Sequence, residues 1–185
     1  MPTLSPFPLT TPRLKLRLHQ SGDLEDLLAY HGQPGVARYL LNVPWTPAEA
    51  ERQMHKRLQR TDLRQSETLP LVWEYGGKVI GDTSLWLTDD AGESSGEVAE
   101  VGWVMNPAFG GQGLATEAVS AVLNLAFDHY RLHRVVAQMD AQNTASAKLC
   151  ERLGMKKEAH LRQNWWSKGE WTDTMIYASL ASDRA

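Results

Sequence analysis

The stretch Pro107-Ala-Phe-Gly-Gly-Gln-Gly-Leu-Ala-Thr-Glu-Ala118 decides the fold, because it leads through a glycine-rich turn directly into the strongest helix signal of the sequence. Gly110, Gly111 and Gly113 permit backbone angles and close approaches that a Cβ would obstruct. The first N–H groups of the following helix lack partners within the helix, and the positive end of its dipole lies there. The stretch therefore predicts an anion site that fits a phosphate or diphosphate.

The common nucleotide-binding patterns do not describe this site. The stretch lacks the Gly-Lys-Ser/Thr of a P-loop, and it lacks the Gly-x-Gly-x-x-Gly of a dinucleotide fold with its acidic ribose ligand. A glycine cluster before a helix most often marks only a tight turn, so the rest of the chain decides between the two interpretations.

The segments around this stretch predict a mixed α/β architecture. Apolar residues spaced i, i+3, i+4 from Ala115 to Tyr130 predict an amphipathic helix. Upstream, apolar and β-prone runs predict strands at Arg13–Leu18, Leu69–Tyr75, Lys78–Leu87 and Glu97–Met105. The second and third of these strands would form a hairpin through the turn Gly76-Gly77. Helical segments are expected at Asp23–His31 and Pro47–Leu63, joined by a loop from Pro34 to Pro47. Downstream we expect a strand, a helix and two strands at Arg134–Met139, Asn143–Leu153, Met155–Trp166 and Glu170–Leu180.

Length and composition indicate one domain. The 185 residues are 42% apolar and 22% charged, and we expect a domain over 10–181 with an extended lead-in at 1–9 and a tail at 182–185. The net charge of −3 disfavours nucleic acid as a partner. A single cysteine, Cys150, excludes an internal disulfide and a Cys-based metal cage. With neither a signal-peptide pattern nor an apolar run long enough for a membrane span, we expect a cytoplasmic protein without a membrane partner.

Two motifs in order resemble the GNAT superfamily of N-acetyltransferases, and more narrowly its RimJ/RimL-like branch, over almost the whole chain. Gly110-Gly-Gln-Gly-Leu-Ala115 is similar to the family's acetyl-CoA loop, Gln/Arg-x-x-Gly-x-Gly/Ala, and departs from it at Gly110. The segment from Asn143 to Met155 resembles the pattern Asn-x-x-Ser-x-x-x-x-Glu-Lys-x-Gly-Phe. The resemblance implies a mixed, mainly antiparallel twisted sheet with flanking helices and a splayed central strand pair.

The resemblance also implies the cofactor and its contacts. Acetyl-CoA would be the co-substrate, and no metal would be required. The loop amides would hold its diphosphate, and the main chain of Val104 and Met105 would pair with the pantetheine arm. The cofactor-binding residues implied are Val104, Met105, Gly110, Gly111, Gln112, Gly113, Leu114, Ala115, Thr116, Asn143 and Ser146.

The implied reaction is attack of an amine on the acetyl thioester. Glu100 is the first candidate for the base and Glu97 the second. Many family members have a tyrosine where this chain has Cys150, so Ser146, Cys150 or solvent would protonate the leaving thiolate. The structural alternatives are an exposed strand carboxylate for Glu100, a helix N-cap for Asn143 and a small buried hydrophobe for Cys150.

The acceptor is an amine whose identity the motifs do not specify. An α-amine with a pKa near 8 needs roughly 1.4 kcal/mol to lose its proton at pH 7, whereas lysine, near 10.4, needs roughly 4.6 kcal/mol. The preferred acceptor is a protein N-terminal α-amine, as in the branch, and the close alternative is a small amine such as an antibiotic or a polyamine. The resemblance implies that Trp45, Trp165 and Trp166 border the acceptor cleft, although packing or a dimer interface is the default explanation for them. A catalytically silent CoA-binding sensor is the hypothesis from another class, and the chain would be a monomer or a homodimer.

Overall fold

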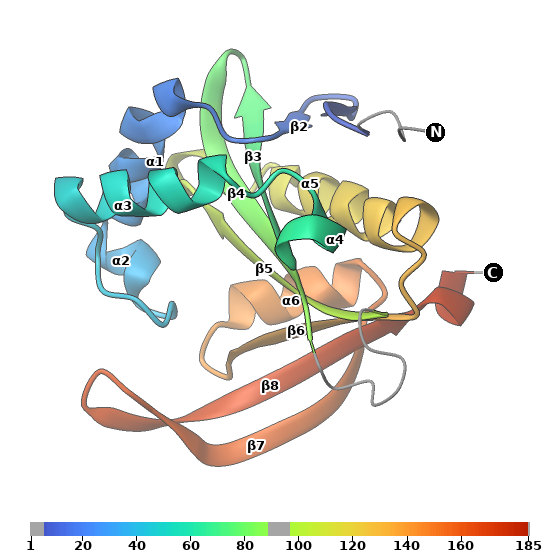
Figure 1. Cartoon of the computed structure of the whole chain (residues 1–185). Coiled ribbons are helices and arrows are strands. Elements are labelled where there is room, and N and C mark those ends of the chain that lie inside the picture. Colours follow the sequence, from blue (N-terminus) through green and yellow to red (C-terminus); the bar gives the residue numbers. More distant parts are fainter. Residues whose placement is uncertain (1–5, 89–96, 185) are drawn as a thin grey trace.

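The computed structural model describes residues 6–88 and 97–184, so most of the lead-in and of the connection Thr88–Gly96 lie outside the described residues. An eight-stranded sheet runs through the chain in the order β1-β2-β3-β4-β5-β6-β8-β7 (Figure 1). Neighbouring strands are antiparallel except for β5 and β6, which are parallel. The strands are β1 (Leu9–Thr10), β2 (Lys15–Arg17), β3 (Thr68–Tyr75), β4 (Lys78–Leu87), β5 (Val98–Met105), β6 (Arg134–Asp140), β7 (Lys156–Ser167) and β8 (Glu170–Leu180). The mixed, mainly antiparallel sheet expected from the sequence is confirmed.

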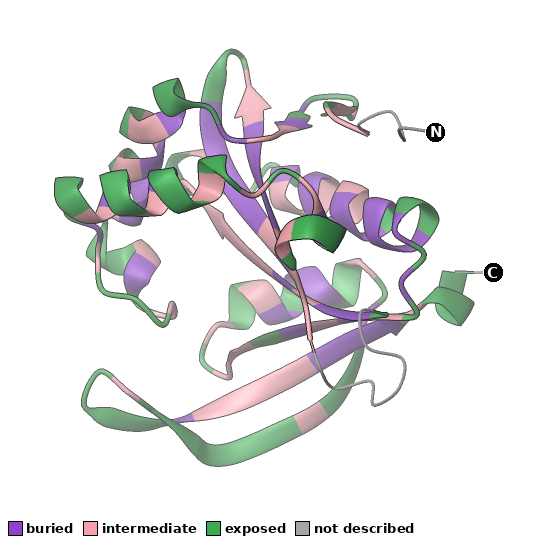
Figure 2. Cartoon of the chain, in the orientation of Figure 1, coloured by how far each residue is buried: buried purple, intermediate pink, exposed green. Residues whose placement is uncertain are grey.

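Helices cover both faces of the sheet. They are α1 (Leu24–His31), α2 (Pro34–Ala37), α3 (Pro47–Leu58), α4 (Leu63–Ser66), α5 (Leu114–Asn124) and α6 (Thr144–Arg152). Val72 of β3 packs in a core cluster with residues of α1 and α3, whereas its neighbours Leu71 and Trp73 belong to the cluster with α5 and α6. Because successive strand residues point to opposite faces, the two groups of helices lie on opposite faces. Figure 2 shows the buried side of α5, the largely exposed strand β7 and the intermediate to buried strand β8.

The glycine turn between β3 and β4 forms as predicted. Gly76 and Gly77 have φ angles of 57° and 80°, and they join Tyr75 to its partner Lys78 in a two-residue hairpin loop. Positive φ at both central positions matches the right-handed twist of the flanking strands, which is why glycine suits this place.

Helix boundaries differ from the sequence expectation where capping residues intervene. The helix expected over Pro47–Leu63 ends at Leu58, and α4 begins after Asp62, whose Oδ1 accepts hydrogen bonds from the amides of Arg64 and Gln65. The expected loop Pro34–Pro47 contains α2, because Pro34 suits the first turn of a helix. The helix expected to reach Tyr130 continues beyond Asn124 as a π-turn over Leu125–His129.

Outside the sheet and helices, short 3-10 turns in the described part of the chain connect or end the elements, at Ser21–Asp23, Pro107–Phe109 and Ala181–Arg184. The last of these places Asp183 against Lys156, with Nζ 2.6 Å from Oδ1. Within residues 6–88 and 97–184, no helix has the length and apolar character needed to cross a membrane.

The only parallel strand pair of the described sheet separates after three residue pairs. Val98, Ala99 and Glu100 of β5 pair with Arg134, Val135 and Val136 of β6. Beyond Glu100, β5 continues to Met105 and β6 to Asp140 without pairing to each other. The splayed central pair implied by the resemblance is therefore present, and it leaves main-chain groups on facing edges open to another partner.

Candidate active site

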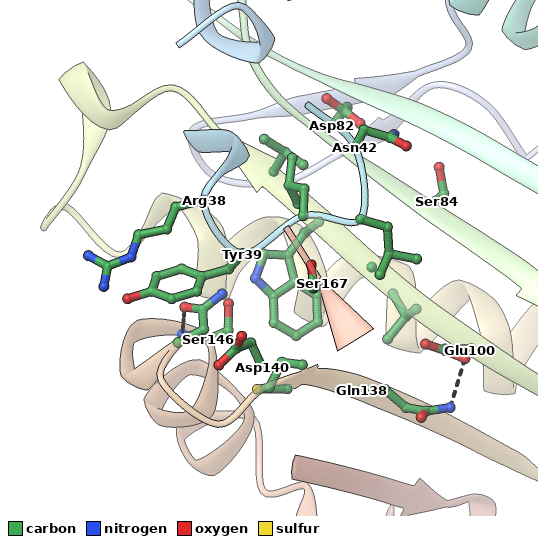
Figure 3. Close-up of a pocket in the computed structure, with 18 of the residues that line it drawn as sticks. Arg38, Tyr39, Asn42, Asp82, Ser84, Glu100, Gln138, Asp140, Ser146 and Ser167 are labelled. Carbon is green, nitrogen blue, oxygen red and sulfur yellow. Dashed lines mark hydrogen bonds between the residues drawn. The ribbon is translucent and has the colours of Figure 1, made fainter. Parts of the chain in front are cut away.

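A cavity of about 590 Å³ opens where β5 and β6 separate (Figure 3). The strands β4, β5 and β6 supply its floor, and α6 closes one end. The segment after α2 and the β7–β8 hairpin supply its outer walls. Six of the residues predicted from the sequence line it together: Trp45, Glu100, Val104, Asn143, Ser146 and Trp165.

Glu100 occupies the point of separation. It is the last β5 residue paired with β6, and its Oε2 accepts a hydrogen bond from Nε2 of Gln138 at 3.1 Å (Figure 3). Its side chain is half-buried and lines the cavity. A carboxylate held at the edge of a water-accessible cavity can take a proton from a bound amine directly or through water.

Asn143 and Ser146 enter the cavity from the first turn of α6. Asn143 is the N-cap, and its Oδ1 accepts a hydrogen bond from the Ser146 amide at 3.2 Å. The side-chain oxygen of Asn143 therefore satisfies a helix N–H that would otherwise lack a partner. The cap also fixes the place of the Ser146 hydroxyl at the cavity wall, so the structural and functional interpretations of Asn143 are compatible.

The glycine-rich loop lies beyond the end of β5 and outside the cavity lining. Gly111 and Gly113 have φ angles of 75° and 76°, and Gly113 is the N-cap of α5. Among the described residues, no acceptor is found for the main-chain N–H groups of residues 113–116, the cap and first turn of α5. This row of unpartnered amides at a helix N-terminus fits the diphosphate of CoA. Met105 ends the strand that connects the cavity to this loop.

An ion pair holds the loop from behind. Arg13 Nε lies 2.7 Å from Oε2 of Glu117, in the first turn of α5, and its Nη1 donates to the Gln112 carbonyl at 2.8 Å. The hydroxyl of Thr11 also donates to Glu117 at 2.6 Å. These contacts tie the glycine-rich loop to the N-terminal segment and fix its geometry.

Besides Met105 and the glycine-rich loop, three more sequence candidates do not line the cavity. Cys150 is completely buried among core residues, and burial raises the pKa of its thiol to about 12. Trp166 is exposed and packs against Trp171, with ring centroids 5.4 Å apart. Glu97 is exposed before β5, where its carbonyl accepts a hydrogen bond from the His133 amide at 2.8 Å. Cys150 therefore fits the structural alternative of a buried small hydrophobe, because its side chain faces the core side of α6.

Sequence reasoning missed a buried polar cluster at the inner end of the cavity. Oδ2 of Asp82, on β4, accepts hydrogen bonds from the Tyr30 hydroxyl at 2.6 Å and pairs with Nε2 of His31 at 2.7 Å. Its Oδ1 pairs with Arg57 at 3.2 Å. Burial alone would raise the pKa of Asp82, but Arg57, His31 and Tyr30 hold it well below its usual range. One sequence signal marks it, since Asp82 is the only acidic residue in the apolar run Lys78–Leu87.

Trp45 connects this cluster to the cavity wall. Its ring stacks on His31 with centroids 3.9 Å apart and 7° between planes, and the Arg57 guanidinium lies 5.1 Å from its centroid. Both contacts hold the Trp45 ring in place. Further aromatic rings that line the cavity are Tyr39, Trp86, Trp103 and Trp165.

Two further charged residues reach the cavity without a sequence signal. Arg38 follows α2, and Asp140 ends β6, where its Oδ1 accepts a hydrogen bond from the Gln142 amide at 2.7 Å. In the part of the chain that the structure describes, no group of three or more His, Cys, Asp or Glu side chains could hold a metal ion.

Comparison with known proteins identifies the family to which this arrangement belongs. The family model of the acetyltransferase (GNAT) domain matches residues 13–156. The uncharacterized N-acetyltransferase p20 of Bacillus licheniformis is 29% identical over 178 residues, covering 96% of this chain and 98% of the relative. The ribosomal protein uS5-alanine N-acetyltransferase of Escherichia coli (strain K12) is 24% identical over 184 residues, covering 95% and 91%.

Solved structures share the fold. An acetyltransferase (GNAT family) from Bacillus anthracis superposes with a TM-score of 0.80 at 25% identity, covering 94% of this chain and 98% of that chain. The spermidine N-acetyltransferase of Vibrio cholerae, solved in complex with CoA and spermine, superposes with a TM-score of 0.77 at 22% identity, covering 93% and 98%. The family model spans both the glycine-rich loop and the splayed strands. The chain therefore belongs to the GNAT family of acetyltransferases.

Proposed function

We propose that this chain is a cytoplasmic N-acetyltransferase that transfers the acetyl group of acetyl-CoA to the α-amine of a protein N-terminus, as in the RimJ/RimL-like branch. One observation carries the proposal. The splayed end of β5 has a carboxylate-bearing cavity on one side and leads directly into a loop whose N–H groups lack partners. An acyl carrier with a diphosphate at one end and a reactive thioester at the other would span both.

The cofactor is proposed to bind along β5. The amides of residues 111–116 would hold the diphosphate, and the unpaired edge at Val104 and Met105 would hydrogen-bond the pantetheine arm. Asn143 and Ser146 line the cavity where the thioester end would lie. Bound acetyl-CoA supplies an acetyl carbonyl with a thiolate leaving group, so that attack by a neutral amine forms an amide.

Glu100 is the proposed base for the acceptor ammonium. Asp82 also lines the cavity, but its oxygens are already occupied by Tyr30, His31 and Arg57, and its lowered pKa makes it a poor proton acceptor. Glu100 keeps a position at the cavity edge, hydrogen-bonded to Gln138. An α-amine makes a strong base less necessary, because its deprotonation at pH 7 needs only roughly 1.4 kcal/mol.

Ser146 is the proposed proton donor to the leaving thiolate. Its hydroxyl is at the cavity wall on α6, whereas the Cys150 thiol is buried on the core side of the same helix. Trp45 and Trp165 are proposed to contact the acceptor's first residues from two sides of the cavity. The uS5-alanine acetyltransferase relative supports an N-terminal acceptor. The chain itself would act as a monomer or a homodimer.

Thiol release across a panel of acceptors tests the proposal. The panel contains N-terminal peptides, matched peptides with blocked N-termini and a free lysine, and small amines including spermidine and an aminoglycoside. Turnover restricted to free N-termini is expected. Turnover of small amines alone would overturn the acceptor assignment, and acetyl-CoA binding without turnover of any amine would instead indicate a CoA-binding sensor.

A further inference from the structure

The tip of the β7–β8 hairpin is anchored to the segment that follows α2. The Lys168 ammonium donates hydrogen bonds to three main-chain carbonyls of that segment, those of Ala37, Arg38 at 3.1 Å and Leu40 at 2.6 Å. The partners are about 130 residues away in sequence. Figure 1 shows the hairpin tip and α2 on the same side of the molecule.

The requirements of the turn do not explain a lysine at this place. Lys168 and Gly169 form the two-residue loop between Ser167 and Glu170, with φ angles of 49° and 90°. Glycine, asparagine or aspartate suits a first loop position with positive φ better than lysine does. The carbonyls at and after the end of α2 do explain it, because a cation there is attracted to the negative end of the helix and can donate to several carbonyls at once.

The two segments that Lys168 joins are opposite walls of the same cavity. Arg38, Tyr39 and the following residues to Asn42 line it from the α2 side. Trp165 and Ser167 line it from the hairpin. Apolar packing contributes little to the outer part of the α2 side, where Leu41 is 75% exposed and Val43 is 69% exposed. The distance between these walls therefore depends on the Lys168 contacts.

We propose that Lys168 is a positioning residue for the acceptor: by bridging the hairpin to the carbonyls after α2, it fixes the acceptor wall of the cavity before the amine binds. The inference rests on the proposed function, in which this cavity receives the acceptor. Lys168 acts through Tyr39 and its neighbours, and it contacts neither the glycine-rich loop nor Glu100. Its removal should weaken acceptor binding and leave cofactor binding unchanged, because a wall that must be ordered on binding lowers affinity.

Lys168→Met is the decisive variant, because it keeps the aliphatic stem and removes the three donors. Lys168→Arg restores a cation, and Lys157→Met is the matched control at an exposed β7 lysine that lines no part of the cavity. Three properties are measured on the full chain: amide hydrogen exchange of residues 38–45, the acetyl-CoA Kd, and kcat and KM for the best acceptor of the panel.

Lys168→Met is expected to speed exchange in residues 38–45 and to raise the acceptor KM about tenfold, the effect of losing roughly one charged hydrogen bond. The acetyl-CoA Kd should stay within about twofold, and Lys168→Arg should restore part of the KM. Unchanged hydrogen exchange in residues 38–45 would overturn the bridge. Hydrogen exchange does not require activity, so this result can be told apart from a failure of the proposed function, in which the wild-type chain acetylates no amine. Faster exchange with an unchanged acceptor KM, or an equal effect of Lys157→Met, would overturn the positioning role.

Discussion

Nε2 of Gln138 lies 3.1 Å from Oε2 of Glu100, and this contact bridges β5 and β6 just where their main-chain pairing ends. A side-chain hydrogen bond thus replaces the next rung of the ladder and holds Glu100 at the cavity edge. The proposed base therefore lies at the residue where β5 and β6 begin to separate.

Glu100→Gln is expected to lower kcat by about a hundredfold, because an amide cannot accept the acceptor proton. The acetyl-CoA Kd should be unchanged, since the cavity shape is retained. The control is Glu97→Gln, which alters an exposed carboxylate beside the same strand and outside the cavity. Steady-state kinetics with a saturating acceptor distinguish the two, and an equal loss in Glu97→Gln would contradict the choice of base.

Ser146→Ala and Cys150→Ala should separate chemistry from packing. We expect Ser146→Ala to lower kcat about tenfold, since water would replace a positioned proton donor. Cys150→Ala should retain kcat and lose about 1 kcal/mol of unfolding free energy, because it removes a buried sulfur from a packed core. Paired kinetics and urea denaturation measure both, and the reverse pattern would restore Cys150 as the proton donor.

Gly113→Val tests the cofactor loop. A β-branched side chain is strained at a φ of 76°, and its bulk would obstruct approach to the neighbouring amides. Acetyl-CoA binding should weaken at least about tenfold by calorimetry, the loss of roughly one charged hydrogen bond. Gly76→Val is the matched control, with a similar strain at a φ of 57° in a distant hairpin. It should lose stability without losing affinity, and equal affinity losses in both would argue against the loop assignment.

Asp82→Asn is expected to reduce stability by about 3 kcal/mol or more, because it leaves Arg57 buried beside a neutral group. Glu158→Gln breaks the exposed pair with Arg134 and should change stability by less than about 1 kcal/mol. Denaturant unfolding at pH 7 compares them. Similar small effects would mean that the buried cluster is not a stabilising unit.

The unfolding free energy should fall between pH 6.5 and pH 4 because of His19. Its ring nitrogens are buried without hydrogen-bond partners among the described residues, and burial, aided by Arg57, lowers its pKa to about 4. Below pH 6.5 His19 is protonated in the unfolded chain but stays neutral in the folded chain. The unfolding free energy present above pH 6.5 is therefore lost as the pH falls toward 4. The loss is roughly 3 kcal/mol.

His19→Leu should remove most of this decrease in unfolding free energy between pH 6.5 and pH 4. Loss through Asp82 follows a separate range, because its folded pKa is lowered and its contribution disappears only below about pH 4, the ordinary aspartate range. Urea unfolding of the wild-type chain and of His19→Leu across pH 4–8 measures this slope. An unchanged slope in His19→Leu would assign the acid loss to another group.

Local spacing was sufficient where the backbone itself decides the outcome. The Gly76-Gly77 hairpin, the glycine N-cap at Gly113 and the Asn143 cap all follow from φ preference or hydrogen bonding within a few residues. Helix boundaries were less predictable at Asp62, whose cap begins α4 within an expected helix, and at Pro34, which begins α2 within an expected loop.

The sequence by itself determined the longer strands and helices, their order along the chain and the position of the glycine-rich loop, because periodicity and turn chemistry act over short distances. Only the tertiary structure decided which polar side chains meet: Asp82 with Arg57 and His31, and Lys168 with the carbonyls after α2. These partners come from elements brought together by the sheet order, and no local period encodes a contact between segments so far apart. Burial likewise decided that Cys150 faces the core and Ser146, one turn earlier, the cavity.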